Sequence, residues 1–160
     1  MALFDHVGEL VHTMAPTGLG DVHMRSHRRG LKVWFGPTTP IKEHYEAQMI
    51  PRRHVDGADG AALEIGFHAE HKAVAANEAV LDALVAERRS WKRELGDETE
   101  FGCFLGNDTW RRISDVWLDP AMDDPDLAFE IASRLVDYLL VIEPIRQART
   151  ADRHDPAEAG

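Results

Sequence analysis

The amino-acid sequence predicts an α+β protein in which one antiparallel sheet of about five strands carries helices on one face. Strand-like segments with alternating apolar residues cluster in the first half of the chain, and helix-like segments with a period near 3.6 stand apart from them. The expected order of elements is α-β-β-β-β-α-β-β-α. We expect residues 1–148 to form a single domain and residues 149–160, which lack apolar anchors, to form a flexible C-terminal tail.

The first half of the chain contains a predicted amphipathic helix and then the strands. Apolar residues recur at helical spacing over residues 3–14, and a Gly- and Pro-rich loop follows. Residues 22–36 alternate around an Arg-Arg-Gly turn, which favours a hairpin, and the prolines and threonines of residues 37–40 break the pattern. Two further alternating strands flank the turn-prone segment 51–60, whose Asp-Gly pairs predict antiparallel pairing.

The second half of the chain contains the other predicted helices and a second hairpin. A long helix is expected from about Lys72 to Leu95, because this segment is rich in helix-forming residues and Gly96 follows it as a cap. Residues 101–118 resemble a hairpin. The last helix is expected to begin near Asp124 and to end or kink at Pro144, since proline removes a backbone donor.

Alternation along the strands sorts their side chains onto two faces of the sheet. The apolar set is expected to face the helices: Leu31, Val33, Phe35, Tyr45, Ala47, Met49, Leu63, Ile65 and Phe67. The opposite face is expected to display the candidate binding residues Lys32, Trp34, His44, Glu46, Gln48, Glu64 and His68.

Part of this polar face has the chemistry of a metal site. His44, Glu46, Glu64 and His68 could supply imidazole and carboxylate ligands to a divalent metal, or form an acid–base pair, if the strand register brings them together. His71 could reach the same region or lie in solvent at the start of a helix. The simpler interpretation is that these residues form the solvated half of an amphipathic sheet. The sequence assigns no catalytic residue and no cofactor.

Composition limits the classes of partner. With 28 acidic and 18 basic residues the formal net charge is -10, which disfavours nucleic acid unless basic pairs such as Arg28-Arg29 gather. No apolar run is long enough to cross a bilayer, and Cys103, the single cysteine, is expected to be a buried structural thiol. These features predict a cytoplasmic protein without disulfides.

No nucleotide-binding, nucleophile-elbow or paired-cysteine motif is present in the sequence. The leading hypothesis is therefore a non-enzymatic protein-interaction or accessory module, bound to a protein partner or to a second copy of itself. Two alternatives are a metal-dependent enzyme that uses the His/Glu cluster and a DNA-associated accessory domain of a defence or nuclease system. The helix and strand order also resembles small acidic dimeric secretion chaperones, as an analogy of architecture.

Four segments carry one family resemblance: AALEIGFHAE, the helix ending WKRELG, the strand TWRRISDVW and the helix containing LVDYLLVIEPIRQ. Together, over about Leu31 to Gln147, they resemble a domain of unknown function found alone or fused to predicted restriction-type nucleases. The resemblance implies an accessory role near DNA or in a defence system and carries over no catalytic residues. The sequence lacks the Asp and Glu-x-Lys elements of a nuclease on adjacent strands.

Overall fold

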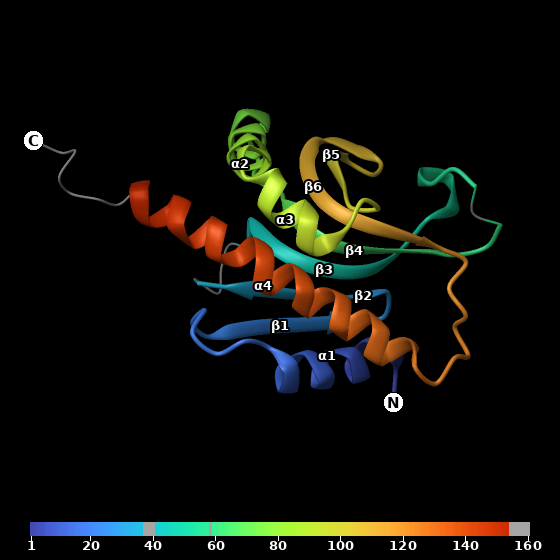
Figure 1. Cartoon of the computed structure of the whole chain (residues 1–160). Coiled ribbons are helices and arrows are strands. Elements are labelled where there is room, and N and C mark those ends of the chain that lie inside the picture. The colour runs from blue at the N-terminus through green and yellow to red at the C-terminus, as the bar shows by residue number, and fades with distance from the viewer. Residues whose placement is uncertain (37–40, 58, 154–160) are drawn as a thin grey trace, which may run out of the picture.

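The computed structural model of the chain describes residues 1–36, 41–57 and 59–153, and within them six strands form one antiparallel sheet. Figure 1 shows the elements in their chain order. The helices are α1 (Leu3–Met14), the short 3-10 helix η1 (Arg52–His54), α2 (Val74–Ala86), α3 (Arg88–Leu95) and α4 (Leu127–Arg153). The strands are β1 (Val22–His27), β2 (Gly30–Phe35), β3 (Glu43–Ile50), β4 (Ala62–Ala69), β5 (Glu100–Phe104) and β6 (Asn107–Leu118), in the spatial order β1-β2-β3-β4-β6-β5.

The predicted α+β class and the order of elements are confirmed, although the sheet has six strands where about five were expected. The predicted break at residues 37–40 lies outside the described residues. Cys103 is exposed, so the prediction of a buried thiol is wrong. Free cysteine is usually buried, which was the basis of the prediction, but β5 is an edge strand with a neighbouring strand on one side only, and it pairs with β6 there.

The helices depart from the predicted boundaries in two places. The segment predicted as one helix divides at Glu87 into α2 and α3, and the Trp91 indole N–H donates to the Leu84 carbonyl across this break at 2.8 Å. Pro144 lies inside α4, which continues to Arg153. Pro144 and Leu140 are both exposed, so water can reach the Leu140 carbonyl that loses its partner. None of the described helices is both long and apolar enough to cross a membrane.

Residues 149–153, which were assigned to the predicted flexible tail, are the last residues of α4. This helix extends past the sheet toward the C-terminal end of the chain in Figure 1. Residues 154–160 lie outside the described residues, and a flexible tail there stays a prediction.

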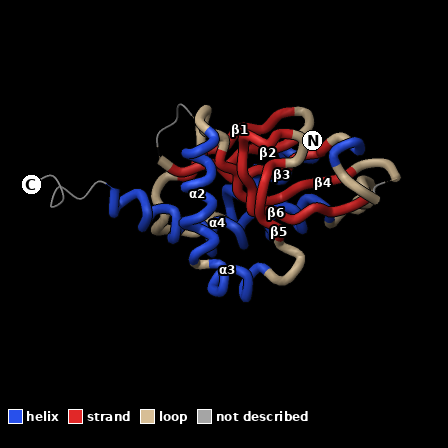
Figure 2. Tube along the Cα trace, turned by 90° about the horizontal axis from the view of Figure 1, so that it is seen from above, coloured by secondary structure: helices blue, strands red, loops and turns tan. Residues whose placement is uncertain are grey.

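The core lies between one face of the sheet and the helices, as alternation predicted. Helices α2, α3 and α4 lie together beside the strands in the view from above (Figure 2). The predicted inward residues of β2, β3 and β4 all belong to this core, with Met49 partly buried at its edge. Helix α1 adds Phe4, Val7 and Val11, and α4 adds an apolar stripe that includes Ile131, Leu135 and Leu139. Their burial is the main stabilising contribution to the fold.

Two buried polar contacts join α4 to the sheet through the apolar core. The Tyr45 hydroxyl donates to Glu143 at 2.8 Å, and the Tyr138 hydroxyl donates to Asp115 at 2.7 Å. Asp115 also accepts from Arg134, while Glu143 accepts two hydrogen bonds from Arg146. Because each buried carboxylate has charged or hydroxyl partners, these contacts orient α4 without leaving an unpaired charge.

The raised pKa values of these two tyrosines predict how the free energy of unfolding depends on pH. Burial, followed by the charge of the partner carboxylate, raises the pKa of Tyr45 and of Tyr138 above the ordinary value of 10.0. Their contribution to the free energy of unfolding is therefore complete below pH 10, where both tyrosines are protonated in the folded and the unfolded chain. As the pH rises above 10, only the unfolded chain loses these protons, and the free energy of unfolding falls by about 2.7 kcal/mol per pH unit for the two groups. Absorbance at 295 nm should show tyrosine ionisation only together with loss of the circular dichroism signal. Ionisation of either tyrosine in the folded protein would contradict this prediction.

Candidate metal centre

The register of the antiparallel strands arranges the polar face of the sheet in rows of opposed residues. His44, His68 and Arg112 form one row across β3, β4 and β6. The next row joins Lys32, Glu46, Gly66 and Ser114, and a third joins Gln48 to Glu64. Side chains in adjacent rows and strands are near neighbours, so the predicted residues share one region of the sheet.

The structure brings the four predicted metal candidates together, but in the interior and not on a solvated surface. His44, Glu46, Glu64 and His68 are between 0% and 4% exposed. Phe104, at the end of β5, lies over this face: its ring meets the His68 ring edge-on, with centroids 4.7 Å apart. The expectation of a solvated polar face is therefore wrong at these residues, since a polar strand pattern does not reveal a distant hairpin that covers it.

The other predicted binding residues surround this cluster. Lys32 and Gln48 are partly buried, and the Gln48 amide donates to Glu64 at 3.4 Å. Trp34, which was expected to be displayed on the polar face, is buried at 6% exposure and stacks on His23 with ring centroids 5.6 Å apart, so that expectation is wrong. His71 pairs with Glu43 at 2.8 Å and is not part of the cluster.

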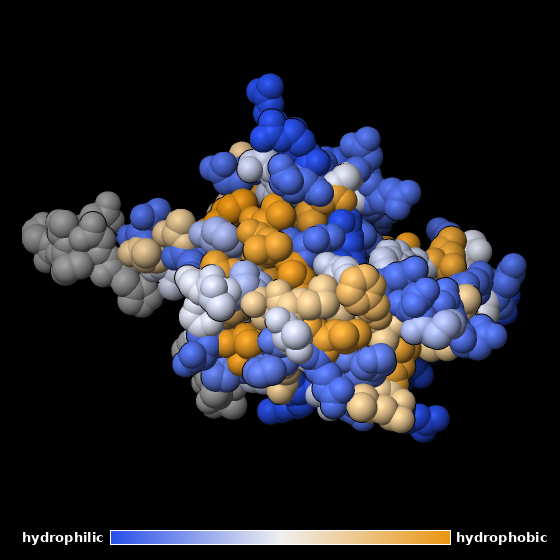
Figure 3. Space-filling model, turned by 60° about the horizontal axis from the view of Figure 1, so that its bottom comes forward, coloured by the Kyte–Doolittle hydropathy of each residue, from blue (hydrophilic) through white to orange (hydrophobic). Residues whose placement is uncertain are grey.

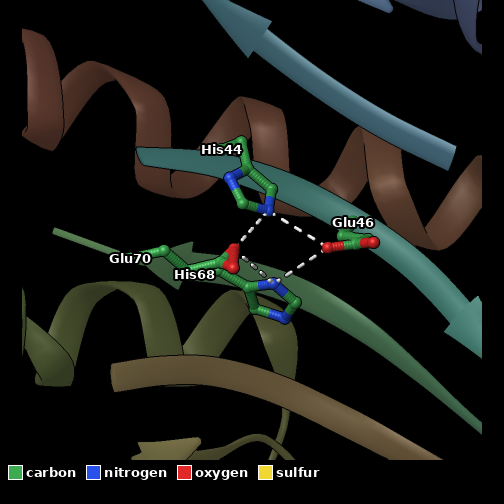
Figure 4. A group of neighbouring side chains, drawn as sticks. All are labelled: His44, Glu46, His68 and Glu70. Carbon is green, nitrogen blue, oxygen red and sulfur yellow. Dashed lines mark hydrogen bonds and ion pairs between the residues drawn. The ribbon is translucent and has the colours of Figure 1, made fainter. Parts of the chain in front are cut away.

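Four ligand-type side chains converge at the centre of the cluster: His44 and Glu46 from β3, His68 from β4 and Glu70 just after β4 (Figure 4). One donor atom from each lies within 4.8 Å of all the others. His44 Nε2 is 3.1 Å from Glu46 Oε2 and 2.8 Å from Glu70 Oε2. His68 Nδ1 is 3.3 Å and 3.8 Å from the same two oxygens. Two nitrogens and two oxygens thus alternate around a common centre.

One of these contacts, between His44 Nε2 and Glu46 Oε2, is a hydrogen bond, and the other three are ion-pair approaches without hydrogen-bond geometry. Within the described part of the chain, His68 Nδ1 and Glu70 Oε2 are buried and form no hydrogen bond, although each faces an oppositely charged or polar atom. Buried polar atoms in folded proteins nearly always have a partner. Donor atoms that point to a shared centre instead of forming hydrogen bonds are the arrangement expected around a cation.

The electrostatics of the cluster also favour a cation. Burial raises the pKa of Glu46 and of Glu70, but the His44 and His68 imidazoles outweigh it, and the net pKa of each carboxyl lies below its ordinary value. Burial lowers the pKa of His68, whereas the charges of Glu64 and Glu46 raise it more, to about 10. The carboxylates are therefore ionised, and in the metal-free protein the protonated His68 imidazole balances part of their charge. A metal ion bound at the centre would displace the proton from His68 and take over this compensation.

The distances fit zinc. Tetrahedral zinc with ligand bonds of about 2.0–2.2 Å places neighbouring ligand atoms about 3.3–3.6 Å apart. The four nitrogen–oxygen separations, 2.8 to 3.8 Å, bracket this spacing, and the nitrogen–nitrogen and oxygen–oxygen separations are at most 4.8 Å. Imidazole and carboxylate ligands suit zinc and related transition metals, whereas magnesium and calcium prefer sites made of oxygen atoms alone.

The cluster differs from the predicted ligand set in one residue. Glu70 faces the centre, whereas Glu64, which was predicted as a ligand, does not. Both oxygens of Glu64 face His68 Nε2, at 2.7 and 2.8 Å, on the side of the ring away from the other ligands. The sequence did contain a signal for Glu70, because residues 64, 66, 68 and 70 continue the same alternation. The predicted polar residues of this strand ended with His68, so Glu70 was not among the candidates.

The basic pairs lie on four separate parts of the described fold. They lie on the β1–β2 turn, in η1, along α3 and on β6. Arg111 and Arg112 on β6 form ion pairs with Glu78 and Glu100. This dispersal gives little support to a phosphate-binding surface.

No protein-family model matches the chain, and no curated protein or solved structure is significantly similar to it. The site is therefore interpreted from its own geometry. The resemblance to the nuclease-associated domain family stays a prediction.

Proposed function

We propose that this chain binds one divalent transition-metal ion, with zinc as the best match, through His44, Glu46, His68 and Glu70. The observation that carries this proposal is the convergence of two imidazole nitrogens and two carboxylate oxygens, all within 4.8 Å of one another in the protein interior. Zinc would replace the imidazole proton as the positive charge beside the buried carboxylates, and it would connect β3 to the segment that follows β4.

A structural role for the ion follows from the number of ligands. Catalytic zinc sites usually have three protein ligands and one position for water or substrate, whereas structural sites have four protein ligands. The four side chains here would complete a tetrahedral coordination sphere. This favours a non-enzymatic accessory module over a metal-dependent enzyme.

Binding of a protein partner is a further part of this proposal. Phe129 and Leu140 of α4 are 56% and 51% exposed. On the side of the molecule that carries α1, apolar side chains gather in a central group bordered by hydrophilic ones (Figure 3). Apolar side chains that remain accessible on a helical face support contact with a partner or with a second copy of the chain.

Isothermal titration with zinc, manganese and magnesium tests the metal proposal. Wild-type protein is expected to bind about one zinc ion per chain more tightly than the other two metals. His68→Ala removes one of the four ligands, and loss of even a residue that only supports a ligand typically costs about 10- to 100-fold, so zinc affinity should fall by at least ~100-fold.

His71→Ala is the matched control, because it removes an imidazole that pairs with a glutamate outside the cluster. Its zinc affinity should equal that of wild type, and circular dichroism should show that both variants are folded. Absence of zinc binding by wild type, or equal binding by the two variants, would refute the proposed site.

A further inference from the structure

Glu64 is the carboxylate closest to the cluster that contributes no atom to its centre. It is completely buried on β4, four residues before His68, and its oxygens lie 2.7 and 2.8 Å from His68 Nε2. Because one imidazole nitrogen faces Glu64, the other, Nδ1, faces Glu46 and Glu70.

We propose that Glu64 is a positioning residue that selects the His68 nitrogen bound to the metal. This inference rests on the proposed function. In the loaded protein, the Nε2–H group of His68 donates to Glu64, which leaves the lone pair of Nδ1 for the ion. Such a carboxylate fixes both the tautomer and the orientation of a ligating imidazole and increases its basicity.

Other side chains hold Glu64 in place. The Ser114 hydroxyl donates to Glu64 at 3.1 Å, and the Gln48 amide donates from the opposite strand at 3.4 Å. Arg112 in turn donates to Ser114 at 2.6 Å and to Glu100 at 2.8 Å. A chain of hydrogen bonds therefore runs from the surface of β5 through β6 to His68.

His44, the other imidazole ligand, has no equivalent support. Its Nδ1 atom is buried and has no hydrogen-bond partner in the described residues. The protein therefore fixes the ring orientation of His68 before a metal binds, and Glu64 is the residue that fixes it.

Nuclear magnetic resonance of wild-type protein with ¹⁵N-labelled histidine and bound ¹¹³Cd²⁺ identifies the coordinating nitrogens. One-bond coupling to the metal is expected at His68 Nδ1 and at His44 Nε2. Coupling at His68 Nε2 would overturn the assignment of Glu64. This test needs no variant and is independent of any effect of substitution on folding.

The energetic test compares two glutamate variants by competition between the protein and a zinc chelator. Glu64→Gln is expected to reduce zinc affinity roughly 10- to 100-fold. Glu43→Gln changes a second glutamate–histidine pair, which is partly buried and lies outside the cluster. Glu43 Oε2 is also 2.8 Å from an imidazole nitrogen, His71 Nε2, so this variant is matched in its contact and should leave zinc affinity unchanged. Equal affinities of the two variants would overturn the positioning role while leaving the metal site intact. A wild-type protein that binds neither zinc nor cadmium would overturn both proposals.

Discussion

Gly66→Ala is expected to destabilise the protein by about 3 kcal/mol or more and to abolish zinc binding. A β-carbon at position 66 would lie 2.2 Å from the Ile113 carbonyl oxygen and 2.5 Å from Ser114 Cα. These are backbone atoms of β6, so β4 and β6 would have to separate to relieve the overlap. Glu46 is directly opposite Gly66, and His68 lies two residues away on the same strand, so the displacement would distort the ligand cluster. Urea denaturation and zinc titration measure both effects.

Gly8→Ala is the control for this substitution. Its β-carbon would meet only Leu31 Cδ1, at 3.5 Å, which is an ordinary contact. Because Gly8 lies inside α1, alanine there should preserve or increase stability, by up to about 1 kcal/mol. If Gly66→Ala proved as stable as Gly8→Ala, the close approach of β4 and β6 would not exist as described.

Zinc is expected to raise the free energy of unfolding of wild-type protein by about 4 kcal/mol when its free concentration is about 1,000 times the dissociation constant. The reason is mass action, because the converged ligands exist only in the folded chain. Residual binding of zinc to unfolded histidines would reduce this value. Urea denaturation with zinc and with a chelator gives the two free energies.

The double variant His44→Ala/His68→Ala should show no such increase, because both nitrogen ligands are gone. Removing zinc from wild type with a chelator should return its stability to the metal-free value. An equal zinc-dependent increase in the double variant would place the stabilising ion elsewhere in the protein.

Local sequence pattern was sufficient to assign the faces of the central strands. Alternation placed His44, Glu46, Glu64 and His68 on one side of the sheet, and the register confirms that they share it. The same pattern could not distinguish the carboxylate that faces the centre of the cluster from the carboxylate that positions His68. Glu64 and Glu70 both continue the alternation from His68, and only side-chain conformation and strand register determine which carboxylate faces the centre.

Burial of the cluster could not be predicted from the strands that form it. Polar residues in alternation normally indicate a solvated face, whereas here Phe104 reaches His68 from a hairpin more than thirty residues later in the sequence. Exposure of Cys103 has a related cause, because the general tendency of cysteine to be buried does not show that β5 is the edge of the sheet. Both errors concern contacts between distant segments, which local periodicity does not encode.

Anomalous diffraction at the zinc absorption edge, from crystals grown with zinc, tests the central claim most directly. The account predicts one strong peak within about 2.0–2.2 Å of His44 Nε2, His68 Nδ1 and one oxygen each of Glu46 and Glu70. A peak found only at surface histidines, or no peak between β3 and β4, would contradict it.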